Sequence, residues 1–217
     1  MGFKAAALQF TVILAGLLFG LVPASGQERV VKLVGFGDSL MAGYQLPPQE
    51  ALPAQLQRKL QAMGVAVEIA NAGVSGDTSA GGRSRVDWSV PDGTDGVILE
   101  LGANDALRGL SPAETEANLD AIIGRLNERG IAVLLVGMLA PPNMGPDYAN
   151  SFNPIYPRLA EKHRLAFYPF VLEGVVTKPE LQLDDGMHPN TEGVAVMADG
   201  MLPVMQAFVE EILKKGK

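Results

Sequence analysis

The chain has 217 residues, of which 47% are hydrophobic and 19% charged, and this balance is typical of a folded globular protein with one domain. Its formal net charge is −7 and its basic residues are not clustered, so we expect no nucleic-acid partner. The absence of cysteine excludes a disulfide framework, a thiol nucleophile and a cysteine metal site.

The N-terminal segment has the organisation of an export signal. A positively charged start precedes an almost wholly apolar stretch over residues 5–22, and small residues follow at Ala24 and Gly26, where a signal peptidase would read them. We therefore expect residues 1–26 to be a signal peptide and residues 27–217 to be a mature domain, periplasmic or secreted, with no stable membrane insertion. An uncleaved anchor is the alternative, because the apolar stretch is about as long as a short membrane span.

Strand-like and helix-like segments alternate along the rest of the chain. In chain order the predicted elements are a strand at 30–36, a helix at 50–63, strands at 65–70 and 96–101, a helix at 111–129, a strand at 131–136, a helix at 151–163, a strand at 165–169 and a helix at 191–214. Short apolar strands alternating with helices predict a parallel sheet covered on both faces, and right-handed crossovers make it a three-layer α/β/α domain.

The helix predicted over 111–129 has the clearest start signal. Ser111 and Glu114 have the spacing of a capping box, and Pro112 occupies the first helical position. The apolar residues expected to face the core are Leu119, Ile122, Ile123 and Leu126.

The most informative short segment is Gly37-Asp38-Ser39-Leu40, directly after the first predicted strand. Ligands of open parallel sheets bind at the carboxyl ends of the strands. A serine at such a strand-to-helix turn is exposed, and the following helix N-terminus stabilises negative charge there. Ser39 is therefore a candidate nucleophile. A simple helix cap is the alternative, because Asp-Ser pairs are common at helix starts.

A second candidate segment, 184–190, precedes the last predicted helix. Serine is a poor nucleophile until a base takes its proton, and histidine is the usual base. The imidazole in turn needs a carboxylate on its other nitrogen, and Asp185 stands three residues before His188. The alternative is a loop in which Asn190 or Thr191 caps the helix.

The chain has one other histidine, His163, between Lys162 and Arg164 at a predicted helix end. There it is expected to face solvent or the helix dipole, which leaves His188 as the candidate base. Two histidines placed so differently do not form a metal-ligand set, so we expect no metal site.

Donors for an oxyanion follow the second and third predicted strands. A tetrahedral intermediate needs N–H groups aimed at its oxygen. The backbone at Gly76, the side chain of Asn104 and the backbone N–H of Ser39 are candidates. The alternative for each segment alone is an ordinary turn, in which glycine takes a positive φ and asparagine caps a helix.

Taken together, these segments resemble the SGNH hydrolases, also called the GDSL family. The matching blocks lie at 37–40, 75–78, 100–105 and 184–190, with further likeness at 42–44 and 155–157, and the resemblance covers roughly residues 30–210. One departure is visible, because Ala103 stands where relatives have a second glycine.

The resemblance implies a role for each of these residues. Ser39 is the nucleophile and an oxyanion donor, Gly76 and Asn104 are the other donors, His188 is the base and Asp185 is its partner, preferred over Asp184. It also implies a flavodoxin-like five-stranded sheet and no metal or organic cofactor.

The expected function is a serine esterase that hydrolyses aryl and acyl esters, and also thioesters and lysophospholipids, by acyl transfer to Ser39. The loops at 106–110 and 138–144 carry apolar side chains suited to an acyl chain, although they also suit ordinary loop anchors. The alternatives are a carbohydrate O-acetylesterase on the same fold and a non-catalytic periplasmic binding module. A nucleotide-binding protein is disfavoured, because neither a P-loop nor a G-x-G-x-x-G pattern is present.

Overall fold

The computed structural model describes residues 1–2 and 29–215. The signal peptide predicted over residues 1–26 therefore lies outside the described residues, apart from its first two.

The centre of the domain is a sheet of five parallel strands in the order β2-β1-β3-β4-β5. The strands are β1 (Val31–Gly37), β2 (Val67–Gly73), β3 (Gly96–Glu100), β4 (Ala132–Val136) and β5 (Ala166–Tyr168). All five lie where the apolar segments predicted them. The end of β2 differs, since it pairs with β1 as far as Gly73 although its apolar pattern stops at Ala70. As an edge strand it tolerates polar and exposed residues there.

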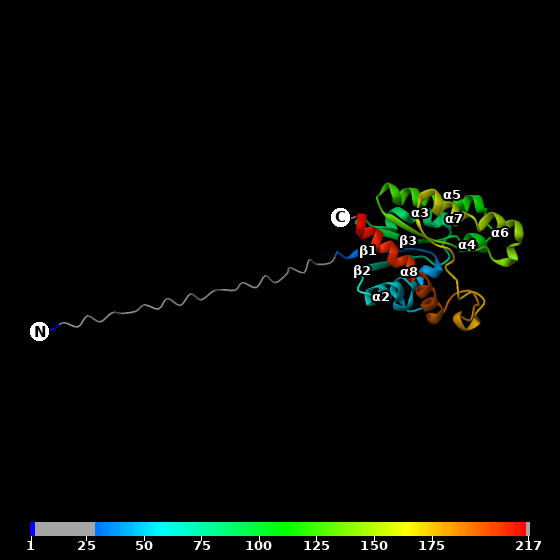
Figure 1. Ribbon diagram of the computed structural model, residues 1–217. Helices are drawn as coiled ribbons and strands as arrows, with labels where there is room; N and C mark the ends of the chain where they lie inside the picture. The colour runs from blue at the N-terminus through cyan, green and yellow to red at the C-terminus, as the bar shows by residue number, and fades with distance from the viewer. Residues whose placement is uncertain (3–28, 216–217) are drawn as a thin grey trace.

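Helices cover both faces of the sheet, as the three-layer prediction requires (Figure 1). On one face, α2 (Leu52–Ala62) packs against α8 (Thr191–Lys215). On the other face, α5 (Pro112–Glu128) lies between α3 (Ser79–Ser89) and α7 (Ile155–His163).

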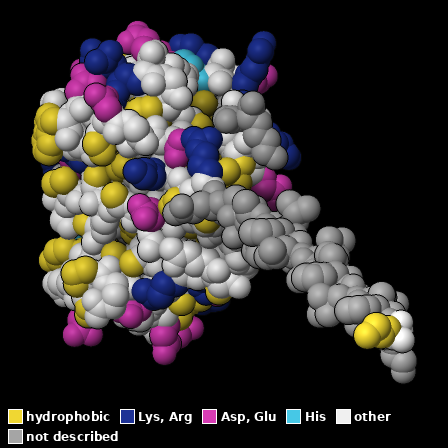
Figure 2. Space-filling view, turned by 90° about the vertical axis from the view of Figure 1, so that its left-hand side faces the viewer, with side chains coloured by type: hydrophobic (Ala, Val, Ile, Leu, Met, Phe, Trp, Pro, Cys, Tyr) yellow, Lys and Arg dark blue, Asp and Glu magenta, His cyan; other side chains and the backbone are white. Residues whose placement is uncertain are grey.

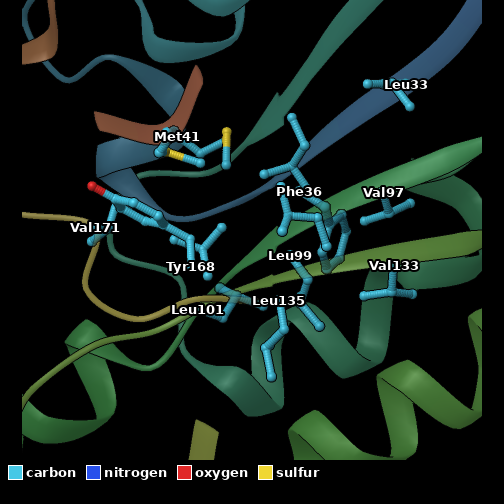
Figure 3. Packing of buried hydrophobic residues seen from close by; sticks show 14 of the residues in the cluster. Leu33, Phe36, Met41, Val97, Leu99, Leu101, Val133, Leu135, Tyr168 and Val171 are labelled. Atoms are coloured by element: carbon cyan, nitrogen blue, oxygen red, sulfur yellow. The ribbon is translucent and has the colours of Figure 1, made fainter. Parts of the chain in front are cut away.

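The core is continuous across these layers. β3 is buried along its whole length, and the predicted core stripe of α5 is fully buried. Figure 3 shows how Leu99 and Leu135 from neighbouring strands pack beside Phe36, with Met41 and Tyr168 in the same cluster. Each such fully buried side chain contributes about 1.5–3 kcal/mol of burial free energy.

Two local predictions about helices were wrong. The helix predicted over 151–163 is two helices, α6 (Pro146–Phe152) and α7, because Pro154 has no N–H with which to continue the first helix. Pro157 fits in the first turn of α7, where a backbone N–H has no helical partner in any case. The capping box of α5 does not form, since the side chain of Ser111 makes no cap hydrogen bond, although Pro112 does begin the helix.

Helix α8 is the one among the described helices with the length and hydropathy of a membrane span. One side of it is buried against the sheet and α2, so it is a core helix of this domain. The surface face in Figure 2 carries basic and acidic side chains interspersed with apolar ones.

Candidate active site

Ser39 lies at the carboxyl edge of the sheet, one residue beyond Asp38, which directly follows the end of β1. It is the first residue of α1 (Ser39–Ala42), and Asp38 caps that short helix by accepting the N–H of Leu40 on Oδ1 at 3.1 Å. The cap alternative therefore applies to Asp38 and leaves the Ser39 hydroxyl free for another partner. In Figure 1 this edge is on the right, where α4 and the yellow-to-orange segment before α8 also lie.

The structure brings Ser39, His188 and Asp185 into one hydrogen-bonded chain. His188 Nε2 lies 2.9 Å from Ser39 Oγ, and His188 Nδ1 lies 2.6 Å from Asp185 Oδ2. The first of these contacts joins residues 149 positions apart in the sequence. The carboxylate favours the tautomer with hydrogen on Nδ1, so Nε2 faces the hydroxyl with its lone pair.

The carboxylate of Asp185 is itself held in place by its own loop. Its Oδ1 accepts the backbone N–H groups of Met187 and His188, each at 2.9 Å. These bonds and the bond to the imidazole lower the pKa of Asp185 from 3.8 to about 2, with the backbone N–H of His188 as the largest cause. The group is therefore an ionised acceptor throughout the neutral range.

The loop that carries the histidine is closed by backbone bonds and anchored to α8. Leu183 donates its N–H to the carbonyl of His188 at 2.8 Å, and Gly186 takes a φ of +64° within the turn. Asn190 Oδ1 accepts the N–H of Gly193 at 2.9 Å. The helix cap is thus Asn190, one of the two residues considered for it.

An aromatic ring that the sequence analysis left without a role lies on the imidazole. The ring centroids of Tyr44 and His188 are 4.4 Å apart, with the planes tilted by 37°. Tyr44 follows Gly43, whose φ of +76° ends α1 and turns the chain toward the histidine. Only the short distance in sequence from Ser39 could have indicated this contact.

Asn104 lies beside the residue that precedes the serine. It belongs to α4 (Ala103–Leu107), and its Nδ2 donates to Asp38 Oδ2 at 3.0 Å. Ala103, the one departure from the family pattern, is partly buried and packs against the core.

Gly76 lies in the loop after β2 and has a φ of +83°, a conformation that favours glycine. The loop is tied to β1 by the bond from Val74 N–H to the carbonyl of Gly37 at 3.0 Å. It is tied to the segment after Asn104 by the guanidinium of Arg108, which donates to the carbonyl of Gly76 at 2.7 Å.

Two buried charged residues stabilise these loops, and neither was given a role from the sequence. Arg85 of α3 pairs with Asp77 at 2.7 Å, donates to the carbonyl of Gly37 at 2.9 Å and lies 4.0 Å from the ring centroid of Phe36. Asp105 accepts the backbone N–H of Ser79 at 2.8 Å and the hydroxyl of that residue at 2.5 Å. Their signal in the sequence is weak, because each reads as a surface charge.

The remaining histidine lies at a helix end, as predicted, because His163 is the last residue of α7. It does not simply face solvent, since its Nε2 lies 2.6 Å from Asp120 Oδ1 and its side chain is mostly buried. This bond, together with Lys162, lowers the pKa of Asp120. Within residues 29–215, no three or more His, Cys, Asp or Glu side chains are grouped as a metal site would need.

Comparison with known proteins finds relatives over most of the chain. The GDSL-like lipase/acylhydrolase family model matches residues 36–196. The arylesterase of Vibrio mimicus is 39% identical over 188 residues, which are 86% of this chain and 94% of that protein. The thioesterase 1/protease 1/lysophospholipase L1 of Escherichia coli strain K12 is 37% identical over 178 residues, which are 82% of this chain and 84% of that protein.

A solved structure gives the same result. The structure of AlinE4, an SGNH-hydrolase family esterase, superimposes with a TM-score of 0.70 at 44% identity, and the alignment covers 82% of this chain and 96% of that one. With a family match over most of its described length, the chain belongs to the GDSL-like lipase/acylhydrolase family and is an ester-hydrolysing enzyme.

Proposed function

We propose that this enzyme hydrolyses esters through an acyl-enzyme on Ser39, with His188 as general base and Asp185 as the carboxylate that orients it. The observation that carries the proposal is the pair of hydrogen bonds from Ser39 Oγ to His188 Nε2 and from His188 Nδ1 to Asp185, at 2.9 and 2.6 Å.

In the first step, Ser39 Oγ attacks the carbonyl carbon while His188 Nε2 accepts the hydroxyl proton. The tetrahedral intermediate then collapses, and the imidazolium gives this proton to the leaving oxygen or sulfur. Water attacks the acyl-enzyme in the second step, with the same histidine as base, and releases the acid.

The oxyanion is bound by the backbone N–H groups of Ser39 and Gly76 and by the side-chain amide of Asn104. The amide of Asn104 has two N–H bonds, and because Asp38 accepts one of them, the other remains for the substrate oxygen. Each donor of this kind stabilises the transition state by about 3–4 kcal/mol.

The substrates we propose are esters with an apolar acyl chain, and also thioesters and lysophospholipids. Support comes from large apolar side chains that stay exposed in segments at this edge of the sheet. These are Val74 (45% exposed), Leu107 (46%), Leu110 (38%), Leu139 (43%) and Met187 (48%). Exposed apolar side chains that gather near a polar site are typical of a ligand surface. Met187 is next to the base, and Leu107 follows Asn104 by one helical turn.

We also propose that the mature enzyme begins near residue 27 and acts in the periplasm or outside the cell. The support is the export-signal pattern in the first 26 residues. Expression of the full chain in a Gram-negative host, followed by fractionation and N-terminal sequencing, tests this. A full-length protein retained in the membrane would contradict it.

The activity is tested with p-nitrophenyl esters from acetate to laurate on the mature protein. Ser39→Ala should lower kcat/KM by at least about 10⁴-fold. Ser84→Ala is the matched control, because this hydroxyl bonds only within the surface of α3. Rates should depend on acyl length, and a preference confined to acetate would favour the O-acetylesterase alternative. A folded wild-type protein as inert as Ser39→Ala would instead favour a binding module.

A further inference from the structure

A pair of buried carboxyl groups lies directly beneath the nucleophile, and the mechanism above assigns no step to either. Asp38 is fully buried and Glu100, the last residue of β3, is only 1% exposed. Gly37, which precedes Asp38, is the register partner of Glu100. The N–H of Asp38 donates to Glu100 Oε2 at 3.3 Å.

The two groups differ in what holds them. The carboxylate of Asp38 accepts two N–H bonds, from Leu40 at 3.1 Å and from Asn104 at 3.0 Å. Glu100 Oε1, in contrast, is buried and has no hydrogen-bond partner among the described residues. Negative charge is therefore stabilised on Asp38 and is poorly stabilised on Glu100.

Two adjacent carboxyl groups in a buried site cannot both be ionised at low cost, so they share a proton. Burial is the largest cause raising the pKa of both groups, to about 6 for Asp38 and well above its usual range for Glu100. The nearby charge of Asp38 raises the pKa of Glu100 further, and this effect is larger than the lowering by either the backbone N–H of Asp38 or that of Met41. The bonds from Leu40 and Asn104 lower the pKa of Asp38. The shared proton therefore belongs on Glu100.

We propose that Glu100 is a positioning residue that stays protonated and donates its hydrogen to the Asp38 carboxylate, which in turn holds the Asn104 amide in the orientation that binds the oxyanion. In this arrangement the proton on Glu100 gives its carboxyl a bond to the Asp38 carboxylate, and Asn104 Nδ2 donates to the same carboxylate at 3.0 Å. This inference rests on the role proposed above for Asn104.

The packing around Gly37 indicates that the side chain of Glu100 has a fixed position. A Cβ atom built on Gly37 would lie 2.4 Å from the backbone oxygen of Glu100 and 2.6 Å from its Oε2. The absence of a side chain at Gly37 therefore leaves the space that the Glu100 carboxyl occupies.

Two other charged groups act on the pair, both through Asp38: His188 lowers the pKa of Asp38 and Asp77 raises it. Tyr156, whose hydroxyl donates to the carbonyl of Leu101 at 2.9 Å, is fully buried near Glu100.

The test compares Glu100→Leu, Glu100→Gln and Asn104→Ala on a p-nitrophenyl ester. Asn104→Ala should lower kcat by about 10²–10³-fold. Glu100→Leu, which removes the donor, should lower kcat by about 10–100-fold with KM within about twofold, because the oxyanion forms only after substrate binding. Glu100→Gln should recover most of this loss, since its amide N–H can replace the O–H.

A double variant separates positioning from general structural damage. If Glu100 acts through Asn104, Glu100→Leu added to Asn104→Ala should cost less than about threefold more, since both changes then affect one donor. Glu68→Leu, an exposed strand glutamate on β2, is the control and should leave kcat unchanged. Thermal unfolding of each variant corrects the rates for the folded fraction.

Any of three results would overturn the inference: losses that multiply in the double variant, a Glu100→Gln enzyme as slow as Glu100→Leu, or a fully active Glu100→Leu. Ser39→Ala in the same assay keeps the two proposals apart. An inactive Ser39→Ala with a fully active Glu100→Leu refutes only the positioning role, whereas an active Ser39→Ala refutes the proposed mechanism itself.

Discussion

Replacing Asp185 by asparagine tests the orientation of the base with little change in shape. The asparagine Oδ1 can still accept the N–H groups of Met187 and His188, which Asp185 accepts at 2.9 Å. The third contact, at 2.6 Å to His188 Nδ1, is reversed, because an amide N–H now faces the ring. The imidazole then carries its hydrogen on Nε2 and donates to Ser39 instead of accepting from it.

The expected loss follows from that reversal. The reactive tautomer would place an N–H of the ring against an N–H of the asparagine, and a reversal of this kind in a serine triad lowers kcat by about 10⁴-fold, equivalent to about 5.5 kcal/mol. The melting temperature should change little, because the two backbone bonds are kept. The measurements are kcat and KM on p-nitrophenyl butyrate at pH 8 and a thermal melt.

The neighbouring carboxylate supplies the matched control. Asp184→Asn removes the same charge one residue away and should leave kcat within about twofold, since Asp185 is the group bonded to the ring. An Asp185→Asn enzyme within tenfold of wild type would refute the reasoning, as would a larger loss for Asp184→Asn.

Three further predictions use other parts of the site. Gly37→Ala should lower the free energy of unfolding by about 1–3 kcal/mol and reduce kcat, because the new methyl group would lie 2.4 Å from a backbone oxygen of Glu100. An unchanged melting temperature and an unchanged kcat would contradict this tight packing. Arg108→Ala should lower kcat by about 3–10-fold, because the carbonyl of Gly76 loses the hydrogen bond that the guanidinium donates, and Arg108→Lys should lose less. Equal rates for wild type and both variants would show that the bond has no role. The stability margin of wild type over Asp185→Ala should be constant above about pH 5 and shrink as pH falls toward 2. The reason is that the folded-state pKa of Asp185 is depressed from 3.8 to about 2, so its ionised form favours the folded loop. An undiminished margin at about pH 2 in urea titrations would argue against this.

The strands could be predicted because each is a short apolar run. Ser39, Asp185 and His188 lie in short segments that each also suit a helix cap or a loop, and it was the combination of segments that singled them out. Helix α3 could not be placed in the same way. It contains adjacent glycines and few apolar residues, and it is stabilised by distant contacts, such as Gly82 against the side chain of Leu101.

The supporting residues were missed for a related reason. Glu100 interrupts an apolar run at the end of a predicted buried strand, which was the one available signal, but its significance depends on Asp38, 62 residues away in sequence. The same holds for Tyr44 and Arg85, whose partners are set by the sheet order. The split of α6 from α7 could have been anticipated from Pro154.

The loop that holds Asp185 and His188 is bonded mainly to itself and to the start of α8, and a single hydrogen bond of 2.9 Å joins its imidazole to Ser39. Local opening of such a segment needs less free energy than unfolding of the buried sheet. We therefore expect heat or mild denaturant to inactivate the enzyme reversibly at temperatures or concentrations at which the core is still folded. On this reasoning, the hydrogen bonds of one loop, and not the melting point of the domain, set the upper temperature at which the enzyme works.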